Sequence, residues 1–527
     1  MAETIESLRN IAFASHGGAG KTSLAETMLY NAGILNRIGR VEDGNTAMDF
    51  EPEELKRNIS LSSGFHQFNW KKHIINLIDT PGDQNFFSDT KSSLQAADSV
   101  IIAVDAVDGI KVQTEQAWEF AEEFKLPCII FINKLDRERA DFMRAFKDAA
   151  ECLEPKPMII QIPIGSEANF NGIVDLVSMK AYTYDAKGKA KKIDIPSDMQ
   201  DSVSEQREAL VENVVESDDE LLERYLEGEP LSDDEIKVAL KKGILSRSFA
   251  PVLCGSATKN IGVDLLQDFI ISCMPSPKDR GSWSAADATG DGEIECRPDP
   301  TAPFSGFVFK TVADPFAGRL SIFRIVSGTL GGDGNFFNVN KDTNERFNQL
   351  LRLAGKEQKQ ISKAGPGAIV AVAKLKETTT GDTICDSKQK VKFKCADPLP
   401  PLISFAVKAK SKGDEDKVFI SLSKLLEEDM SLQLTRNPET KQILLSGLGQ
   451  VHIEVTTERL KRKFNVEVQL DSPKVPYKET ITKKVRVQGK HKKQTGGHGQ
   501  YGDCWIQLEP LPRGEGFEFE NKIVGGV

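Results

Sequence analysis

The chain has 527 residues, a formal net charge of −10 and an apolar share of 39%, and at about 150 residues per domain this length predicts three or four domains. The longest apolar runs, Val100–Val104 and Cys128–Ile132, are far shorter than the roughly 18 residues that a membrane-spanning helix needs. The N-terminus has no signal pattern and the 8 cysteines form no C-x-x-C pair, so we expect a soluble, multidomain, cytoplasmic protein without a zinc site or a disulfide framework.

Charge is distributed unevenly along the chain. Between Asp198 and Glu235 there are 15 acidic and 2 basic residues. A second stretch is basic and contains 8 positive residues and one acid, Glu479: Lys474, Lys478, Lys483, Lys484, Arg486, Lys490, Lys492 and Lys493. Such polarity is typical of separate faces for different partners, and two solvated helical or strand faces are an equally good interpretation of the charge alone.

Residues 1–274 alternate short β-branched runs with helical patterns, which predicts a parallel sheet with helices on both faces. The expected strands are Ile11–Ser15, Ile74–Ile78, Val100–Asp105, Cys128–Asn133 and Pro251–Cys254. The acidic stretch 198–245 predicts two helices joined at Gly228–Pro230, in a subdomain of about 155–245 that is inserted before the last strand. Residues 275–302 are rich in Pro, Gly, Ser and Asp, which predicts a linker.

The second half of the chain has a different pattern. Short alternating strands with glycine turns predict a β-barrel over 303–395. Residues 396–480 predict an α+β domain with helices at Asp416–Asp429 and Gln450–Lys463. The segment 481–527 is expected to begin a fourth domain, and its end on an apolar strand and glycines at Ile523–Val527 suggests a sequence that breaks off within a longer chain.

A glycine-rich loop follows the first predicted strand and precedes a helix. Ser15–Thr22 reads SHGGAGKT, in which backbone N–H groups can surround a β-phosphate at the helix N-terminus. Lys21 would bridge the β- and γ-phosphates, and the hydroxyl of Thr22 would bind Mg²⁺. Ser15 stands where the usual motif begins with glycine, and a simple glycine-rich turn is the alternative interpretation.

The sequence Asp79-Thr-Pro-Gly82 ends the next strong strand. A carboxylate there can hold Mg²⁺ through water, and the N–H of Gly82 can reach the γ-phosphate. Taken alone, this tetrapeptide is equally well explained as a β-turn. Its position after a phosphate loop favours the nucleotide-binding interpretation.

Two further strand ends complete a guanine-binding pattern. In Asn133-Lys-Leu-Asp136 the last carboxylate can accept from N1–H and the 2-amino group of guanine, whereas adenine would leave it buried without a partner. Backbone N–H groups after Cys254 in CGSA can meet the guanine oxygen. The expected GTP-binding residues are Gly17, Gly18, Ala19, Gly20, Lys21, Thr22, Ser23, Asp79, Gly82, Asn133, Lys134, Asp136, Ser256 and Ala257.

With these motifs the chain resembles bacterial elongation factor G, a translational GTPase. The resemblance extends to DPFAGRL at Asp314–Leu320, LKETTTGDT at Leu375–Thr383 and LSGLGQVH at Leu445–His452, and to QTGGHGQYGD at Gln494–Asp503 and FEFENKIVGG at Phe517–Gly526. It implies a GTP domain with an inserted subdomain, a β-barrel, a small α+β domain and part of the domain that enters the decoding region.

The sequence departs from the family at the catalytic position. A His that orients the attacking water follows the family's DTPG glycine, and Asp83 stands there in this chain. A carboxylate would repel the γ-phosphate, while Gln84 lies one residue, about 3.3–3.6 Å, out of register. Gly18 replaces a phosphate-loop Asp, which removes a ligand for a monovalent cation, and Arg57-Asn-Ile-Ser60 replaces the family's RGIT switch with a hydroxyl kept for Mg²⁺ at Ser60.

The resemblance implies a GTPase that uses GTP, GDP and Mg²⁺, with the metal held by Thr22, Ser60 and Asp79, and with Asp83 or Gln84 as candidates for catalysis. It implies ribosomal RNA and ribosomal proteins as partners of a monomer with no membrane contact. Translocation and ribosome disassembly are both open, and so is a non-hydrolysing protection or recycling factor. The basic run suits rRNA phosphates or a solvated strand face. His452 and Cys254 are expected to be packed residues.

Overall fold

The computed structural model of the chain describes residues 4–229, 231–288, 290, 292–314, 318–411, 413–477 and 479–525. Four expectations fall partly outside these residues: the helix junction at Pro230, the family segment at Pro315–Ala317, Lys478 of the basic run, and the end at Gly526–Val527. One structural unit comprises Met1–Arg436 and Ile443–Ser472, and the other comprises Asn437–Gln442 and Pro473–Val527.

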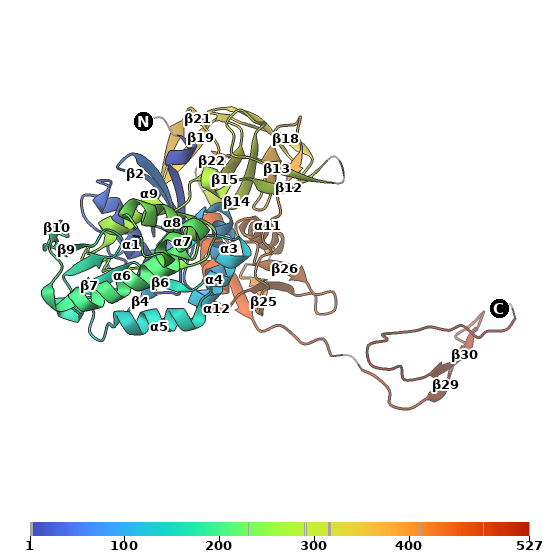
Figure 1. The fold of residues 1–527 in the computed structure, drawn as a ribbon. Coiled ribbons are helices and arrows are strands. Elements are labelled where there is room, and N and C mark those ends of the chain that lie inside the picture. The colour runs from blue at the N-terminus through green and yellow to red at the C-terminus, as the bar shows by residue number, and fades with distance from the viewer. Residues whose placement is uncertain are drawn as a thin grey trace. The chain divides into compact units, whose positions relative to one another are not determined.

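Seven strands form the central sheet of the first 274 residues (Figure 1). In spatial order they are β2 (Gly64–Trp70), β3 (His73–Asp79), β1 (Leu8–Ala14), β4 (Ser99–Asp105), β5 (Cys128–Asn133), β11 (Ala250–Cys254) and β6 (Pro157–Ile159). Neighbours are parallel except for β2 and β3. Every residue of β1 and β4 is buried, as in strands covered on both faces.

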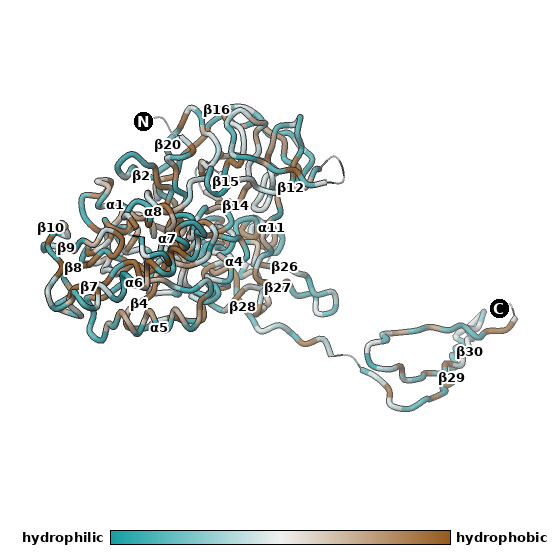
Figure 2. The backbone as a smooth tube through the Cα atoms, in the orientation of Figure 1, coloured by the Kyte–Doolittle hydropathy of each residue, from teal (hydrophilic) through white to brown (hydrophobic). Residues whose placement is uncertain are grey.

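Helices cover both faces of this sheet. They are α1 (Lys21–Asn31), α3 (Phe87–Ala96), α4 (Val112–Glu123), α5 (Phe142–Cys152) and α9 (Val263–Cys273). The β3–α3–β4 and β4–α4–β5 crossovers run in the same direction along the sheet, so right-handed connections place α3 and α4 on one face. There they lie side by side, and α1 lies beside α9. Figure 2 shows apolar segments gathered in the interior of this region.

The five predicted strands are all present, but β2 and β6 were not predicted. In β2 (GFHQFNW) polar residues separate the aromatic ones, because this strand lies at the sheet edge and pairs on one side only. The other edge strand, β6, has only three residues and begins with Pro157, a residue that sheets accept at edges. Neither strand therefore forms the long apolar run that marks the central ones.

The predicted insertion contains more structure than its charge pattern indicated. Its four strands form an antiparallel sheet in the order β10 (Ala190–Ile193), β9 (Lys180–Tyr184), β8 (Gly172–Asp175), β7 (Gln161–Ile164). The prediction of two helices is wrong, because the described residues of this stretch form three: α6 (Gln200–Val215), α7 (Asp219–Leu226) and α8 (Asp233–Leu245). Asp218 lies after the end of α6 and caps α7 by accepting from the backbone N–H of Leu221. Ser232 caps α8 by accepting from the backbone N–H of Glu235, whose side chain accepts in turn from the backbone N–H of Ser232.

The predicted linker is not irregular. It contains α10 (Pro277–Arg280), β12 (Trp283–Asp287) and β13 (Glu293–Cys296), and these strands form a sheet with β24 (Val391–Lys392). Trp283 orders the segment, because the guanidinium carbons of Arg280 and Arg324 lie 4.8 and 5.1 Å from its ring centre and its ring packs edge-on against Phe393. The composition of residues 275–302 does not reveal this packing, because a single aromatic residue provides it.

An eight-stranded antiparallel sheet follows and confirms the predicted barrel-like domain. Its order is β18 (Thr343–Phe347), β17 (Gly334–Asn338), β23 (Thr383–Cys385), β14 (Ser305–Asp314), β15 (Gly318–Ser327), β22 (Ile369–Ala373), β19 (Leu350–Ala354) and β20 (Glu357–Ile361), with a small separate pair, β16 (Leu330–Gly331) and β21 (Lys363–Ala364). Val308, Phe323 and Phe347 lie in its core.

The α+β region has four strands in the order β26 (Gln433–Arg436), β27 (Ile443–Gly447), β25 (Ile403–Ala409) and β28 (Val468–Asp471), with α11 (Glu415–Leu426) and α12 (Gln450–Phe464) in contact with each other. Both helices were predicted within a few residues. Leu422, Leu445 and Leu460 form their shared core with the sheet.

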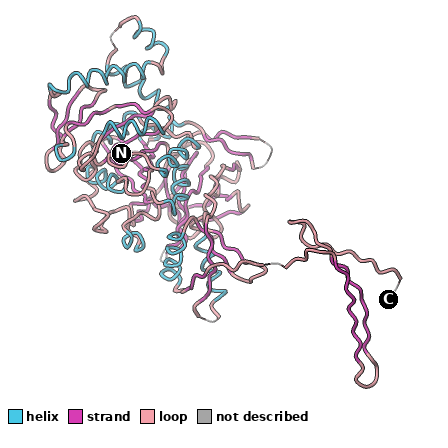
Figure 3. Tube along the Cα trace, turned by 90° about the horizontal axis from the view of Figure 1, so that it is seen from below, coloured by secondary structure: helices cyan, strands magenta, loops and turns pink. Residues whose placement is uncertain are grey.

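The second unit contains the hairpin of β29 (Val485–Lys493) and β30 (Gln500–Leu508), drawn in Figure 3 as two long strands joined by a loop. Its register pairs Val485 with Leu508 and Lys493 with Gln500. Alternation therefore places Arg486, Lys490 and Lys492 on one face. On that face the charged groups of Arg486 and Lys490 lie 5.0 and 5.8 Å from the rings of Trp505 and Tyr501.

Candidate nucleotide-binding site

The phosphate loop joins β1 to α1 and bends through two glycines. Gly18 and Gly20 have φ angles of 87° and 94°, in the left-handed region that favours glycine. A Cβ added to Gly20 would collide with the amide nitrogen of Asn133. Lys21 begins α1 and donates through Nζ to the carbonyls of Ser15 and His16 at 3.0 and 2.9 Å, so its ammonium lies across the loop.

The turn after β3 packs directly on this loop. A Cβ added to Gly82 would lie 2.7 Å from the backbone nitrogen of Gly17 and would collide with Nζ of Lys21. The sequence DTPG therefore closes over the phosphate loop, which brings the predicted residues Gly17, Lys21 and Gly82 together. Ala19 and Ser23 lie in the loop and in the first turn of α1.

Four oxygen-bearing side chains meet beside Lys21: Thr22, Asp49, Ser60 and Asp79. The hydroxyls of Thr22 and Ser60 are 3.2 Å apart. Within the described residues, Oδ2 of Asp49 and Oδ1 of Asp79 are buried and lack a hydrogen-bond partner. Burial raises the pKa of Asp79, and the nearby carboxylate of Asp49 raises it further.

This oxygen set fits a small hard cation. Burial raises the pKa of Asp49 and lowers the pKa of Lys21, because each charge has lost water. Two unsatisfied carboxylate oxygens and two hydroxyls are the donor type that Mg²⁺ prefers. Sequence reasoning named Thr22, Ser60 and Asp79 but missed Asp49, which lies in a polar stretch without periodicity and reaches the site through the fold.

Asn133 connects three loops at the other end of the site. Its Nδ2 donates to the carbonyl of Ala19 at 3.0 Å, and its Oδ1 accepts from the backbone nitrogens of Lys134 and Ala257 at 2.8 and 3.0 Å. Lys134 crosses the phosphate loop and bonds the Gly18 carbonyl at 2.6 Å and Asp105 at 2.7 Å. The three motifs therefore share one edge of the sheet.

The predicted base-recognising carboxylate lies next to this junction. Oδ1 of Asp136 is buried and has no hydrogen-bond partner among the described residues. Ser256 is fully buried in the neighbouring loop, and the carbonyl of Ala257 accepts from the hydroxyl of Thr27 at 2.9 Å. An unsatisfied buried acceptor is costly, so the site suits a ligand that brings N–H donors.

Asp83 is held by the residues that follow it. Its Oδ1 accepts from the backbone nitrogen and from Nδ2 of Asn85 at 2.8 and 2.7 Å, so it caps the short helix η2 (Gln84–Phe86). Gln84 is exposed. Sequence reasoning missed Asn85, whose role depends on a close approach: a Cβ on Gly449 would collide with its Oδ1.

One helix, α12, contacts both loops that border the cation site. Its first turn packs on η2, where the rings of Phe86 and His452 lie 5.5 Å apart, and Val455 forms an apolar cluster with Leu61 and Phe86. His452 is 2% exposed and its Nε2 lies 2.8 Å from Asp429, and Cys254 is fully buried. Both are packed residues, as predicted.

Ion pairs join the second half of α12 to α2 (Pro52–Arg57), which lies in the loop between Asp49 and Ser60. Glu458 lies 2.7 Å from both Lys56 and Arg57. Arg462 bonds Glu53 at 2.7 and 3.0 Å and also pairs with Glu51. The position of this loop is therefore tied to α12.

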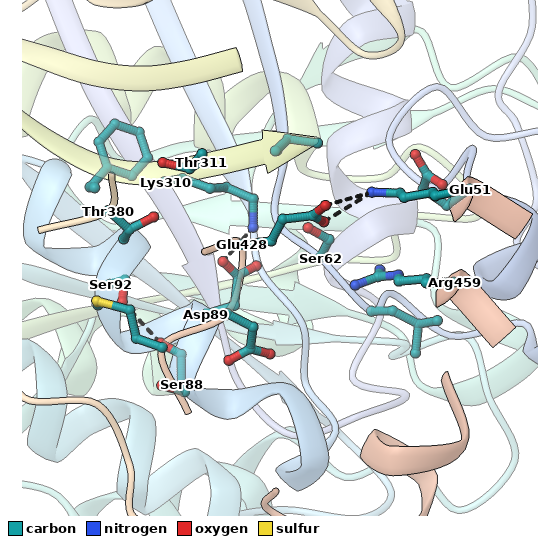
Figure 4. A pocket seen from close by; sticks show the side chains of 16 residues that line it. Glu51, Ser62, Ser88, Asp89, Ser92, Lys310, Thr311, Thr380, Glu428 and Arg459 are labelled. Carbon is teal, nitrogen blue, oxygen red and sulfur yellow. Dashed lines mark hydrogen bonds and ion pairs between the residues drawn. The ribbon is translucent and has the colours of Figure 1, made fainter. Parts of the chain in front are cut away.

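A small polar cavity of about 50 Å³ lies between α3, β14 and α12 (Figure 4). Lys310 pairs with Asp89 across it, and Lys463 bonds both oxygens of Glu428 at 2.9 Å. Arg459 also lines it. Residues of the sheet domain, the barrel-like domain and the α+β region therefore all line the cavity, and the pair of Lys310 and Asp89 joins the first two.

Comparisons with known proteins agree with this architecture. Residues 6–276 match the model of the elongation factor Tu GTP-binding domain. Residues 303–387, 399–472 and 473–527 match elongation factor G domains 2, III and IV. The chain belongs to the elongation factor G family of translational GTPases.

A crystal structure of a protein from Thermus thermophilus is similar to this chain, with 34% sequence identity and a TM-score of 0.85. The match covers 96% of the present chain and 74% of the Thermus chain. Membership of the family implies a guanine nucleotide as ligand and the ribosome as partner. Among the helices that the structure describes, none is long and apolar enough to cross a membrane.

Gly82→Ala tests the close contact between the DTPG turn and the phosphate loop. Because the new Cβ meets a backbone atom, the loops must separate, and overpacking of this kind costs about 1–3 kcal/mol. The free loops can relax whereas the bound nucleotide needs them closed, so up to this full cost falls on binding and the Kd for GDP should rise by roughly 5- to 150-fold. Fluorescence titration with a labelled nucleotide measures the change. Gly365→Ala is the control, because its Cβ would meet no described atom within 4 Å; equal affinity of the Gly82 variant and the wild type would refute the contact.

Proposed function

We propose that this protein binds GTP with Mg²⁺ and acts on the ribosome in the cytoplasm, where nucleotide occupancy sets the orientation of its domains during translocation or ribosome disassembly. The observation that carries the proposal is the helix α12, because it contacts the loops on both sides of the cation site. A change in those loops would therefore move the α+β domain.

We assign the phosphates to Gly17–Ser23 and Gly82, and the base to Asn133, Lys134, Asp136, Ser256 and Ala257. Thr22 and Ser60 would bind Mg²⁺ directly and Asp79 through water, and Asp49 joins them. The metal would neutralise phosphate charge. The domain boundaries at 274, 302, 395 and 480 stay predictions, as does a monomeric state.

The catalytic step depends on Asp83. Its carboxylate stands at the position of the family's water-orienting His, and the bonds from Asn85 hold one of its oxygens. A negative charge there opposes the γ-phosphate and the attacking water beside it, which a neutral imidazole does not. We therefore propose a GTPase with slow intrinsic cleavage, in which Gln84 is the other candidate for orienting water.

The carboxylate of Asp83 at the catalytic position also favours a second function. This would be a ribosome-binding factor that acts when GTP is bound and does not need to hydrolyse it. Such a protein would protect or recycle ribosomes. The acidic helices α6–α8 suit a basic ribosomal protein, and the cationic and aromatic face of the β29–β30 hairpin suits rRNA, whose phosphates and bases attract such side chains.

Base specificity tests the nucleotide assignment. Replacing Asp136 by Asn removes a charged acceptor worth about 1.5–3 kcal/mol, so the Kd for GTP should rise roughly 10- to 150-fold in equilibrium titrations. Glu138→Gln changes an exposed charge two residues away and should leave the Kd unchanged. Competition of ATP with GTP on the wild type at equal concentration would contradict a guanine site.

Single-turnover GTP cleavage on ribosomes tests the role of Asp83. Asp83→His should raise the rate at least about 10-fold, because a well-placed polar group is worth roughly 100- to 1,000-fold in such steps. Asp83→Asn separates charge from position, since the amide oxygen can still cap η2, and should give a smaller increase. Cleavage by the wild type that is already as fast as in Asp83→His would rule out impaired catalysis.

A further inference from the structure

Glu54 is a buried carboxylate with four backbone donors. It lies on α2 and is 2% exposed. One oxygen accepts from the backbone nitrogens of Phe50 and Glu51 at 3.1 and 3.0 Å. The other accepts from those of Leu61 and Ser62 at 3.0 and 3.2 Å. Burial and the nearby carboxylate of Asp49 raise its pKa to about 7, and the N–H donors and Arg459 oppose this shift.

These four bonds join the two ends of the loop 49–62. Phe50 follows Asp49 and Leu61 follows Ser60, so each pair of bonds fixes the backbone next to one oxygen ligand of the candidate cation site. Helix capping explains only the bond to Glu51, the N-cap residue of α2. The bonds to Leu61 and Ser62 cross the loop and have no role in capping.

The neighbouring Glu53 provides a natural comparison. It lies on the same helix and is also buried, at 4% exposure. Its carboxylate, however, pairs with Arg462 and so attaches α2 to α12 from outside the loop. Glu54 is directed into the loop, and Glu53 is directed away from it.

We propose that Glu54 is a positioning residue for the nucleotide site: its carboxylate holds the loop 49–62 closed, so that Asp49 and Ser60 face the cation beside the γ-phosphate. The proposal rests on the proposed function. It also predicts that Glu54 matters for the GTP form and not for the GDP form, because only the γ-phosphate end of the site needs this loop. Leu61 is placed by the same bonds in the apolar cluster under α12.

Glu54→Gln tests the proposal in the full chain. The shape is kept, but the amide nitrogen faces two N–H groups that it cannot accept, so one pair of bonds is lost. We expect the Mg²⁺ concentration at half-maximal binding of a non-hydrolysable GTP analogue to rise about 10-fold, as a loss near 1.4 kcal/mol implies. GDP affinity should stay within about 2-fold, and hydrogen exchange at the amides of residues 61 and 62 or 50 and 51 should accelerate.

Glu53→Gln is the matched comparison. It weakens the ion pair with Arg462 but keeps the four bonds of Glu54, so it should shift the Mg²⁺ midpoint and the exchange of these amides less than Glu54→Gln does. Glu54→Asp is a second variant that keeps the charge but is one methylene too short to reach both pairs, and it should shift the midpoint in the same direction. Melting of the GDP complexes checks folding.

Unchanged exchange and an unchanged Mg²⁺ midpoint in Glu54→Gln would overturn the proposal. Equal losses of GTP and GDP binding with a lower melting temperature would overturn it as well, because Glu54 would then serve the fold alone. Binding of the GTP analogue by the wild type without any dependence on Mg²⁺ would refute the cation site of the proposed function, whereas faster amide exchange in the variant would still report the bonds of Glu54.

Discussion

Two carboxylates, Asp49 and Asp79, are buried side by side with oxygens that no described group satisfies. Burying an unpaired charge costs several kcal/mol even after relaxation, so this arrangement needs a counter-charge or a proton on one of the two carboxyl groups, and the raised pKa of Asp79 agrees with this. Lys21 supplies part of it. Asp79 is fixed at the end of β3, whereas Asp49 lies on a loop. A change in the positive charge that faces the two carboxylates would therefore move mainly the loop.

In the proposed function, the loop transmits that change to the α+β region through α12. The ion pairs of Glu458 and Arg462 are partly exposed, and such pairs are each worth about 1 kcal/mol or less. The cluster of Leu61, Phe86 and Val455 is almost fully buried, and each buried apolar side chain is worth about 1.5–3 kcal/mol. The apolar cluster therefore contributes most of the free energy that holds α12 against the two loops. The ion pairs contribute less and fix how α12 is aligned with α2.

The sequence predicted what depends on local pattern. Long buried apolar runs identified β4 and β5, and the spacing of glycines, Lys21 and strand ends identified the nucleotide motifs. Edge strands such as β2 were not predicted, because a strand that pairs on one side only does not form a long apolar run. The ordered structure of the linker was not predicted either, because it depends on a single residue, Trp283. Asp49 reaches the site only through the tertiary fold. Glu54 and Asn85 also make local bonds, but the contacts that give them their roles here, with Leu61 and Ser62 and with Gly449, arise from the tertiary fold and follow no spacing rule.

If α12 couples the nucleotide to the α+β region, this one helix responds to both loops of the nucleotide site. Hydrogen exchange of the full chain with GDP and with a non-hydrolysable GTP analogue plus Mg²⁺ tests it directly, because it follows residues 49–62, 79–86 and 450–464 at the same time. We expect the GTP analogue to slow exchange in all three segments together. Slower exchange in the two loops with no change in α12 would contradict it.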